Sequence, residues 1–269
     1  MTTPAYSLRI AMLAAFSLCS AGAFAQDRAV QSRNYELGIA SVDSDTSGST
    51  SNGTLGVSLG ATQPIGGWAG IAVSGYFSSS KVRTGDVLGE DDGTASAGSR
   101  PSCSFDNSGG EISLFVRRPS LGKVAATYGV GKVSPDCGDS TLFIGSGKDD
   151  LSTDNYRFDA EAYLGDFTVG AAYTSTDLDE GLKLETTAVT ASWYPLDSLK
   201  LSLSGNDLYE QDTYGLMIEH QPEFLGDAFG INVGYSNSDQ EPKTRTIYLG
   251  MTYYFGTHVA LKARDRQYR

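Results

Sequence analysis

Hydrophobic and polar residues alternate along most of this chain. In residues 229–237, Phe229, Ile231, Val233 and Tyr235 alternate with glycine, asparagine and serine. Successive side chains of a β-strand point to opposite faces of the sheet, so this alternation predicts strands with one apolar and one polar face. No apolar helical period competes with it after residue 25. The pattern therefore predicts an all-β protein.

The alternation divides the chain into about twelve strands, most of them near the length that a tilted membrane-crossing strand requires. Residues 183–194 are ambiguous, because Leu184 and Val189 have opposite parity. The predicted strands are 34–42, 53–62, 68–77, 111–118, 123–132, 155–164, 167–175, 183–194, 199–206, 213–220, 229–237 and 245–255.

The connections between these strands alternate in length. Tight turns such as QPIGG, PSLG and PLDS are followed by longer polar loops, for example residues 78–110. Outer-membrane barrels have short periplasmic turns and longer extracellular loops. A soluble β-sandwich also explains the alternating strands, but its solvent face is usually richer in Lys and Glu than the small polar face seen here. The sequence therefore favours a transmembrane up-and-down antiparallel β-barrel of about 12 strands.

The N-terminal residues have the features of a secretory signal peptide. Arg9 is followed by an apolar run that ends in Ala23-Phe24-Ala25. A cationic start, a short apolar core and a small-x-small end are typical of a cleaved signal. The predicted organisation is a signal peptide over 1–25, a barrel over 26–256 and a basic tail over 257–269.

The last predicted strand carries a family resemblance. Tyr248, Gly250, Tyr253 and Phe255 resemble the C-terminal assembly signal of Gram-negative outer-membrane β-barrel proteins, although here the chain continues as GTHVALKARDRQYR. The resemblance implies a location in the bacterial outer membrane. The implied partners are membrane lipid, lipopolysaccharide and the barrel-assembly machinery. The barrel pattern itself covers nearly all of the chain after residue 25.

The charge of the chain excludes one class of partner. The formal net charge is −12, and removing residues 1–25 takes away Arg9 and no acid, which leaves −13. Nucleic acid is held mainly by Lys and Arg on its phosphates, so we expect no nucleic-acid binding. The tail is locally basic and is expected in the periplasm as an unstructured end, with contact to anionic lipid or peptidoglycan as the alternative. Its basic residues are Lys262, Arg264, Arg266 and Arg269.

Two cysteines, Cys103 and Cys137, remain after the signal. Exported cysteine pairs usually form disulfides, and two thiols with only His220 and His258 are a poor zinc set. The predicted topology places both cysteines in extracellular loops, where they can meet. We therefore predict a Cys103–Cys137 disulfide.

Catalysis is not expected. His220 has outward parity, His258 lies in the tail, and no G-x-S-x-G motif occurs. The acidic loop residues, among them Asp86 and Asp149, lack the spacing of a calcium loop and are interpreted as solvated charge. The prediction is a protein without enzymatic activity, metal or cofactor.

The inward face of the predicted barrel offers the candidate site. Many inward positions are glycine, which fills little space, and the few charged ones could line a constriction that selects solutes. The alternative is an internal cluster of ion pairs with a structural role. The candidate pore-lining residues are Glu36, Glu111, Arg117, Lys123, Arg157, Asp159, Glu161, Lys200 and Glu219.

Two functions follow from this reading. The first is a narrow, porin-like passive diffusion channel for small hydrophilic solutes. The second is a structural or adhesive surface barrel with a plugged lumen, acting through its acidic extracellular loops.

Overall fold

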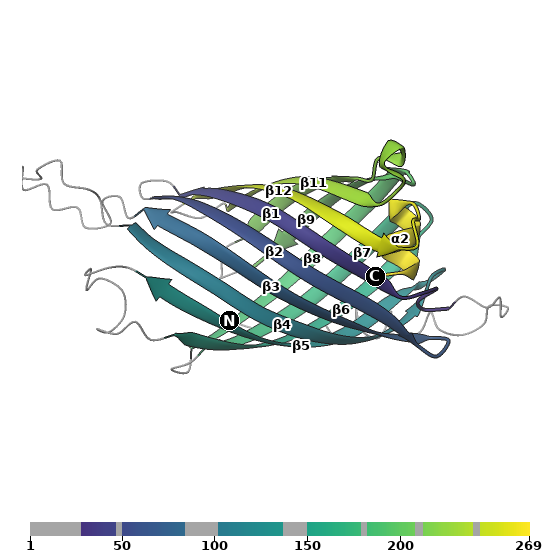
Figure 1. Ribbon diagram of the computed structural model, residues 1–269, viewed down its shortest axis with the longest axis horizontal. Helices are drawn as coiled ribbons and strands as arrows, with labels where there is room; N and C mark the ends of the chain where they lie inside the picture. Colours follow the sequence, from purple (N-terminus) through teal and green to yellow (C-terminus); the bar gives the residue numbers. More distant parts are fainter. Residues whose placement is uncertain are drawn as a thin grey trace, which may run out of the picture.

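The computed structural model describes residues 28–46, 50–83, 102–136, 150–178, 182–207, 212–238 and 243–269. Within these ranges the chain forms a closed antiparallel barrel (Figure 1). Each strand pairs with its neighbours in sequence, and β12 closes the barrel against β1. The predicted all-β, up-and-down barrel of 12 strands is confirmed.

The strands tilt across the barrel wall and are mostly longer than the predicted segments (Figure 1). They are β1 (Asn34–Thr46), β2 (Thr50–Ile65), β3 (Ala69–Arg83), β4 (Ser102–Arg118), β5 (Gly122–Asp136), β6 (Leu151–Leu164), β7 (Phe167–Leu178), β8 (Leu182–Leu196), β9 (Leu199–Asn206), β10 (Thr213–His220), β11 (Phe229–Ser238) and β12 (Thr244–Gly256).

The first predicted loop is largely strand. The sequence suggests that the first strand ends at residue 42, whereas β1 continues to Thr46 with an unbroken register against both neighbours. Its outward residues change from Ile39 to Asp43 and Asp45. Backbone pairing needs no apolar face, so the ladder continues where the outer surface becomes polar. We infer that this part of the wall stands above the lipid.

Away from this polar end, the strands present an apolar outer surface. Leu55, Val57 and Leu59 on β2 are all exposed, as is Leu249 on β12. Strand β8 resolves the ambiguity in the sequence, because Val189 faces outward and Leu184 has the opposite, inward parity. An outward apolar surface of this kind is what a lipid-facing barrel wall requires.

Outer-membrane barrels carry girdles of aromatic residues at the membrane interfaces, and the sequence offers Trp68, Tyr76, Tyr163 and Trp193 near strand ends as candidates. Two of these four residues face outward. Trp193 is exposed and stacks against Phe167, with ring centroids 6.2 Å apart, and Trp68 is exposed at the β2–β3 turn. By contrast, Tyr76 and Tyr163 have inward parity on β3 and β6. The assignment of these two residues to the girdle is therefore wrong.

Inward glycines make room for large inward side chains. A Cβ atom at Gly60 would lie 2.8 Å from Cγ of Glu36, and one at Gly230 would lie 3.1 Å from the Tyr254 hydroxyl. Real Cβ contacts do not come that close to a heavy atom without a shift of the neighbour. At both positions, the space that the glycine leaves is therefore filled by a neighbouring side chain.

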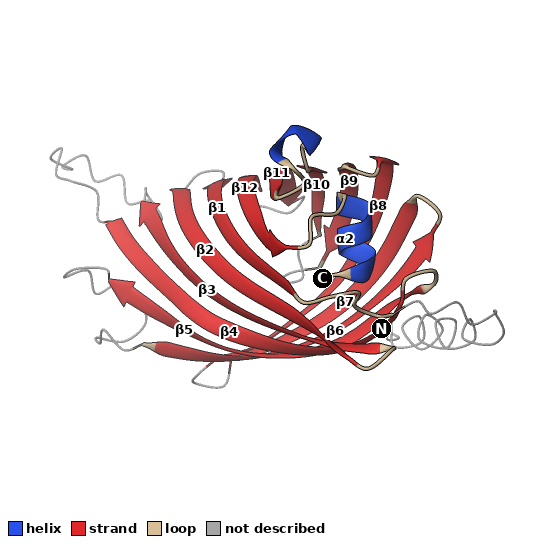
Figure 2. Ribbon diagram, turned by 45° about the vertical axis from the view of Figure 1, so that its right-hand side comes forward, coloured by secondary structure: helices blue, strands red, loops and turns tan. Residues whose placement is uncertain are grey.

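The tight turns gather at one end of the barrel, together with residues 28–33 and 257–269 (Figure 2). Gly165, with φ of 62°, forms the β6–β7 turn, where a positive φ suits glycine. The longer β10–β11 connection contains a short 3₁₀ helix, η3 (Glu223–Leu225), on which Phe224 is highly exposed. By the barrel rule of short periplasmic turns, this end is the periplasmic one.

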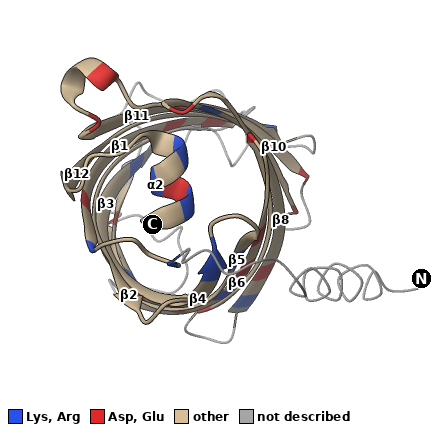
Figure 3. Cartoon of the chain, turned by 90° about the vertical axis from the view of Figure 1, so that its right-hand side faces the viewer, with Lys and Arg blue, Asp and Glu red and all other residues tan. Residues whose placement is uncertain are grey.

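The C-terminal tail is ordered. Residues Leu261–Gln267 form the helix α2, which lies inside the ring of strands when the barrel is viewed from its periplasmic end (Figure 3). The expectation of an unstructured tail is wrong, because its basic side chains find acceptors within the barrel rather than in solvent.

The N-terminal residues of the described chain also enter this end. Val30 is fully buried against Phe115 and Ala125, and Ala29 donates its N–H to the carbonyl of Gly67 at 2.8 Å. Gln31 donates its N–H to the carbonyl of Gln267 at 2.9 Å, which joins the two terminal segments. We call residues 28–33 and 257–269 together the periplasmic plug. Among the described residues, no helix is both long and apolar enough to span a bilayer.

Candidate constriction and lumen cavity

Arg264 anchors the plug to β1 and β12. Its side chain is fully buried, with the guanidinium carbon 3.9 Å from the centre of the Tyr254 ring. It donates to Asn34 Oδ1 at 3.1 Å, and to the carbonyls of Asp227 and Val259 at 3.1 and 3.3 Å. Burial of this guanidinium lowers the pKa of Arg264 from its ordinary value. Hydrogen bonds and ring stacking offset the cost of burying the charge.

Arg266 anchors the plug to the opposite wall. It donates to the carbonyls of Gly165 and Phe167 at 2.7 and 2.8 Å and lies over the rings of Tyr163 and Tyr194. Planar guanidinium groups stack well on aromatic rings while their edges donate hydrogen bonds. Arg264 and Arg266 therefore fix α2 across the lumen.

Lys262 binds the rim rather than the interior. Its ammonium group donates to Asp166 Oδ1 at 2.6 Å and lies 3.8 Å from Asp197 Oδ1. This contact lowers the pKa of Asp166, chiefly through the hydrogen bond from Lys262. Both carboxylates are well exposed, so we expect these pairs to stabilise the plug little.

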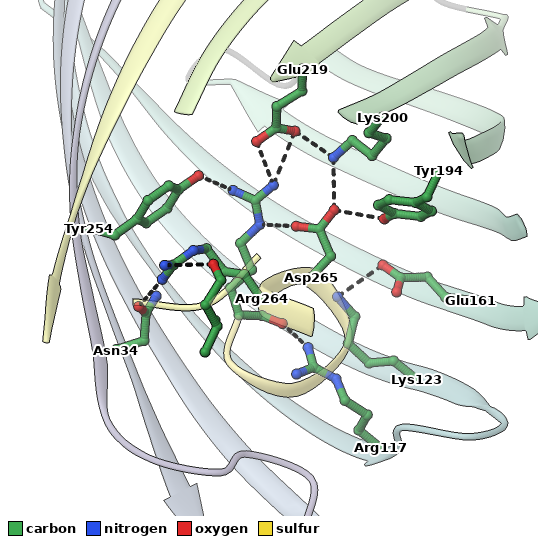
Figure 4. Close-up of polar contacts among 12 residues, drawn as sticks. Asn34, Arg117, Lys123, Glu161, Tyr194, Lys200, Glu219, Tyr254, Arg264 and Asp265 are labelled. Atoms are coloured by element: carbon green, nitrogen blue, oxygen red, sulfur yellow. Dashed lines mark hydrogen bonds and ion pairs between the residues drawn. The ribbon is translucent and has the colours of Figure 1, made fainter. Parts of the chain in front are cut away.

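A charged network lies between the plug and β8 to β10 (Figure 4). Arg269 Nε lies 2.7 Å from Asp265 Oδ1, and its Nη2 donates to both Glu219 oxygens at 3.0 and 3.2 Å. Lys200 Nζ lies 2.5 Å from Glu219 Oε2 and 2.9 Å from Asp265 Oδ2. Two cations thus share two carboxylates, and Tyr194 adds a hydrogen bond to Asp265 at 2.7 Å.

The network sets the charge of Asp265. Burial alone would raise the pKa of this carboxyl, but the charges of Arg269 and Lys200 and the hydrogen bonds from Tyr194 and Lys200 outweigh it. The pKa of Asp265 therefore lies well below its ordinary value. In turn, burial opposes the charge of Arg269, but Asp265 and Glu219 raise its pKa well above the ordinary value. Both shifts favour the charged forms of Asp265 and Arg269.

Arg117 joins the two halves of the plug. It donates to the carbonyl of Ala29 at 3.2 Å and to the main-chain oxygen of Arg269. Its guanidinium carbon lies 4.8 Å from the centre of the Phe115 ring. One side chain of β4 therefore holds both terminal segments.

Above the plug, strands β5 to β9 enclose a cavity of about 410 Å³. Short side chains of β7 and β8, including Thr168, Gly170 and Ala188, leave this space. The charged lining residues are Lys123, Arg157, Lys200, Arg266 and Arg269, with Asp159, Glu161 and Asp265. Lys123 pairs with Glu161 at 2.9 Å, and Arg157 pairs with Asp159 at 2.6 Å.

The nine predicted pore-lining residues all have inward parity, but they fall into three groups. Arg117 and Glu219 contact the plug directly, whereas Lys123, Arg157, Asp159, Glu161 and Lys200 line the cavity, and of these five Lys200 also pairs with Asp265 of the plug. Glu36 lies against Gly60 on the β1–β2 wall, and Glu111 lies against Gly129 on β5, both outside the cavity lining. Their roles in a pore remain predictions.

Sequence reasoning missed the residues that the plug contributes. Asp265, Arg266 and Arg269 line the cavity, yet they lie beyond the last strand, where the barrel pattern carries no information. The inward parity of Tyr254 could have indicated a partner, since an inward aromatic near the periplasmic end needs something to pack against. The basic composition of the tail is evident from the sequence, but it does not identify the acceptors, because these are distant in sequence.

Two other predictions concern the assembly signal on β12 and the disulfide between the two cysteines. Tyr248 and Gly250 face inward, whereas Tyr253 and Phe255 face outward with their rings 4.6 Å apart and perpendicular. The role of these four residues as an assembly signal remains a prediction. The predicted loop position of Cys103 is wrong, because this residue lies within β4 and pairs with Val82 of β3. The disulfide itself lies outside the described residues, because the structure does not describe Cys137 or the side chain of Cys103.

Comparisons with known proteins bear on the fold. No family model matches the chain, and no curated protein matches it by sequence. An outer membrane channel from Pseudomonas putida F1 superposes with a TM-score of 0.62 at 10% identity, over 87% of this chain and 100% of that one. The translocator domain of autotransporter NalP from Neisseria meningitidis has a TM-score of 0.50 at 12% identity, over 92% and 95% of the two chains.

The chain has the fold of the bacterial outer-membrane β-barrels. The beta domain of the Bordetella autotransporter BrkA agrees, with a TM-score of 0.51 at 9% identity over 83% of this chain and 99% of that one. The barrel resides in the outer membrane, and its apolar outer face contacts lipid.

Proposed function

We propose that this outer-membrane barrel is a narrow passive diffusion channel for small hydrophilic solutes. The observation that carries the proposal is the cavity of about 410 Å³ inside the barrel, lined by hydroxyl and charged groups. An apolar or fully packed lumen would offer no such path for a hydrated solute. The proposed transport involves no catalytic step.

The periplasmic plug makes the channel narrow. Helix α2 occupies the lumen at the end where Arg117, Lys200 and Glu219 project inward (Figure 3, Figure 4). A barrel of this strand number lies between the side-chain-filled eight-stranded barrels and the water-filled porins. Solutes that pass must do so along the wall of β5 to β9, beside the plug.

The structural or adhesive barrel is the second candidate. The observation in its favour is the same plug, in which Arg264, Arg266 and Arg269 all donate hydrogen bonds to the barrel. A non-conducting barrel that acts through its extracellular loops would need no open lumen. Of the acidic loop residues that such a role would use, Asp86 and Asp149 lie outside the described residues, whereas Asp150 pairs with Lys132 and Asp154 lies in β6.

Planar-bilayer recording of the refolded protein tests the proposal. We expect small discrete ohmic steps from the full barrel and larger steps from a variant that lacks residues 258–269. Circular dichroism and heat-dependent gel mobility provide the folding control for both proteins. If both barrels fold and neither conducts, the channel is overturned and the structural barrel is favoured.

Partners beyond lipid are also proposed. The outward Tyr253 and Phe255 on the closing strand are accessible to the barrel-assembly machinery before β12 pairs with β1. Lipopolysaccharide would contact the polar outer rim of the strands, where Asp43 and Lys132 are exposed.

A further inference from the structure

The cavity presents its cations to the lumen and keeps most of its acids behind them. In the Arg157–Asp159 pair, the arginine side chain is 50% exposed and the aspartate 15%. Arg269 is 28% exposed, whereas its partners Glu219 and Asp265 are 5% and 14% exposed. In two other pairs the acid is the more exposed member, by 28% to 19% for Glu161 over Lys123 and by 14% to 11% for Asp265 over Lys200. The charge that a solute meets is therefore predominantly positive.

Both carboxylates of the plug network already have cationic partners. Asp265 accepts from Tyr194 and Lys200 and pairs with Arg269, and Glu219 accepts two hydrogen bonds from Arg269. By contrast, Arg157 directs Nε and Nη2 at a single oxygen of Asp159, which leaves further N–H groups on a half-exposed guanidinium. The guanidinium of Arg157 therefore has donors available to a ligand in the cavity.

The hydroxyl groups of the adjacent strands add further donors. Thr168 and Thr174 on β7 and Thr190 on β8 line the cavity beside Arg157, and a hydroxyl can donate to an anion as readily as it accepts from a hydroxyl. A ligand that complements such a lining brings acceptors and one negative charge. The space of about 410 Å³ admits a molecule with a few carbon atoms together with water.

We propose that this cavity is a binding site for small hydroxylated carboxylates, with Arg157 as the group that anchors the carboxylate. This rests on the proposed channel function and names its solute class. The overall acidity of the chain does not oppose it, because salt screens exposed charges beyond about 10 Å, whereas charges inside a narrow lumen are screened much less. The pore then passes such anions in preference to cations.

Gluconate and its neutral counterpart sorbitol are the probes. In isothermal titration calorimetry of the refolded full-length barrel, we expect gluconate to bind and sorbitol to bind at least tenfold more weakly. In bilayers, gluconate should reduce the KCl current, and a KCl gradient should give a reversal potential of the sign for anion selectivity.

Two variants locate the site. Arg157→Gln removes the anchoring charge-assisted hydrogen bonds and should weaken gluconate binding about tenfold. Asp159→Asn removes the competing carboxylate and should leave binding equal or tighter, so it controls for general damage to this wall. Arg245→Gln removes the same charge from the outer face of β12 and should change nothing.

The outcomes separate the two proposals. A barrel that binds gluconate but never conducts overturns the channel and leaves the site standing. A barrel that conducts but binds gluconate no better than sorbitol, or whose binding is unchanged in Arg157→Gln, overturns the site and leaves the channel standing. Equal loss of binding in Arg157→Gln and Arg245→Gln also overturns it, because the effect would then be one of net charge alone.

Discussion

The guanidinium of Arg264 lies 3.9 Å above the ring of Tyr254, and both side chains are fully buried. The contact joins the last helix of the chain to the strand that closes the barrel. Tyr254 is the inward neighbour of Tyr253 and Phe255 in the strand, so one short segment faces both lipid and plug. Docking of the tail thus depends on the same strand whose pairing completes the barrel wall.

Arg264→Gln should release the plug without unfolding the barrel. The change removes the stacking and several hydrogen bonds from a charged group, a loss of at least about 2 kcal/mol of docking free energy. That corresponds to a roughly 30-fold shift toward the undocked tail. Limited proteolysis should cleave the tail faster, while the strand signal in circular dichroism is retained. Lys262→Gln is the matched control on the same helix and should have little effect, because its partners are exposed. Equal protease sensitivity of the two variants would contradict the assigned role of Arg264.

The plug should stay docked in mild acid and loosen only at strongly acidic pH. The pKa of Asp265 is lower in the folded barrel than in the free chain, so its ionisation stabilises docking above the free-chain value of about 4. That stabilisation is lost as the pH falls through the lowered folded pKa, when Asp265 no longer pairs with Lys200 and Arg269. Hydrogen exchange of the α2 amides should be equally slow at pH 7 and pH 5 after correction for the intrinsic rate. In Asp265→Asn, this protection should already be reduced at pH 7. Faster exchange of the unmodified protein at pH 5 than at pH 7 would show that another group controls docking.

Substitutions on the two faces of β12 should differ in cost. Leu249 faces outward and Thr252 faces inward. Leu249→Arg should lower the free energy of unfolding by about 2–4 kcal/mol near mid-membrane, because it places a cation in lipid. Thr252→Arg should cost less, since the lumen offers water and acidic partners. Denaturant titration of barrels refolded in bilayers measures both, and equal penalties would count against a lipid-facing exterior.

The cysteine crosslink can be tested on intact protein. Ser104 and Asp136 face each other in the register of β4 and β5, and each is the sequence neighbour of one cysteine. A disulfide needs Cα atoms within about 7 Å. Non-reducing mass spectrometry should show a Cys103–Cys137 crosslink, with a chain-entropy contribution of roughly 3–4 kcal/mol. The barrel should remain folded on reduction, because its closed ladder of hydrogen bonds holds the wall. Two free thiols in protein recovered from an oxidising periplasm would rule out the bridge.

The sequence alone determined the wall of this protein. Alternation in segments such as residues 229–237 assigned inward and outward faces, because the period of a strand is two and a slip by one residue would turn every apolar side chain inward. The same local rule placed all nine candidate charges on the lumen face. The contrast between short turns and long loops indicated which end of the barrel is periplasmic. These properties depend on residues close in sequence.

Only the tertiary structure decided what fills the lumen. Arg264 meets Asn34 across almost the whole chain, and Arg269 meets Glu219 on β10, contacts that no periodicity encodes. The alternation assigned both Glu36 and Arg157 to the lumen face as candidate pore-lining residues, whereas only Arg157 lines the cavity. A strand pattern states which face a side chain takes, but not which distant charge lies opposite it. Closure of the barrel brings β1, β10 and β12 around one axis, and the buried charges of the tail then take the acceptors that lie within reach.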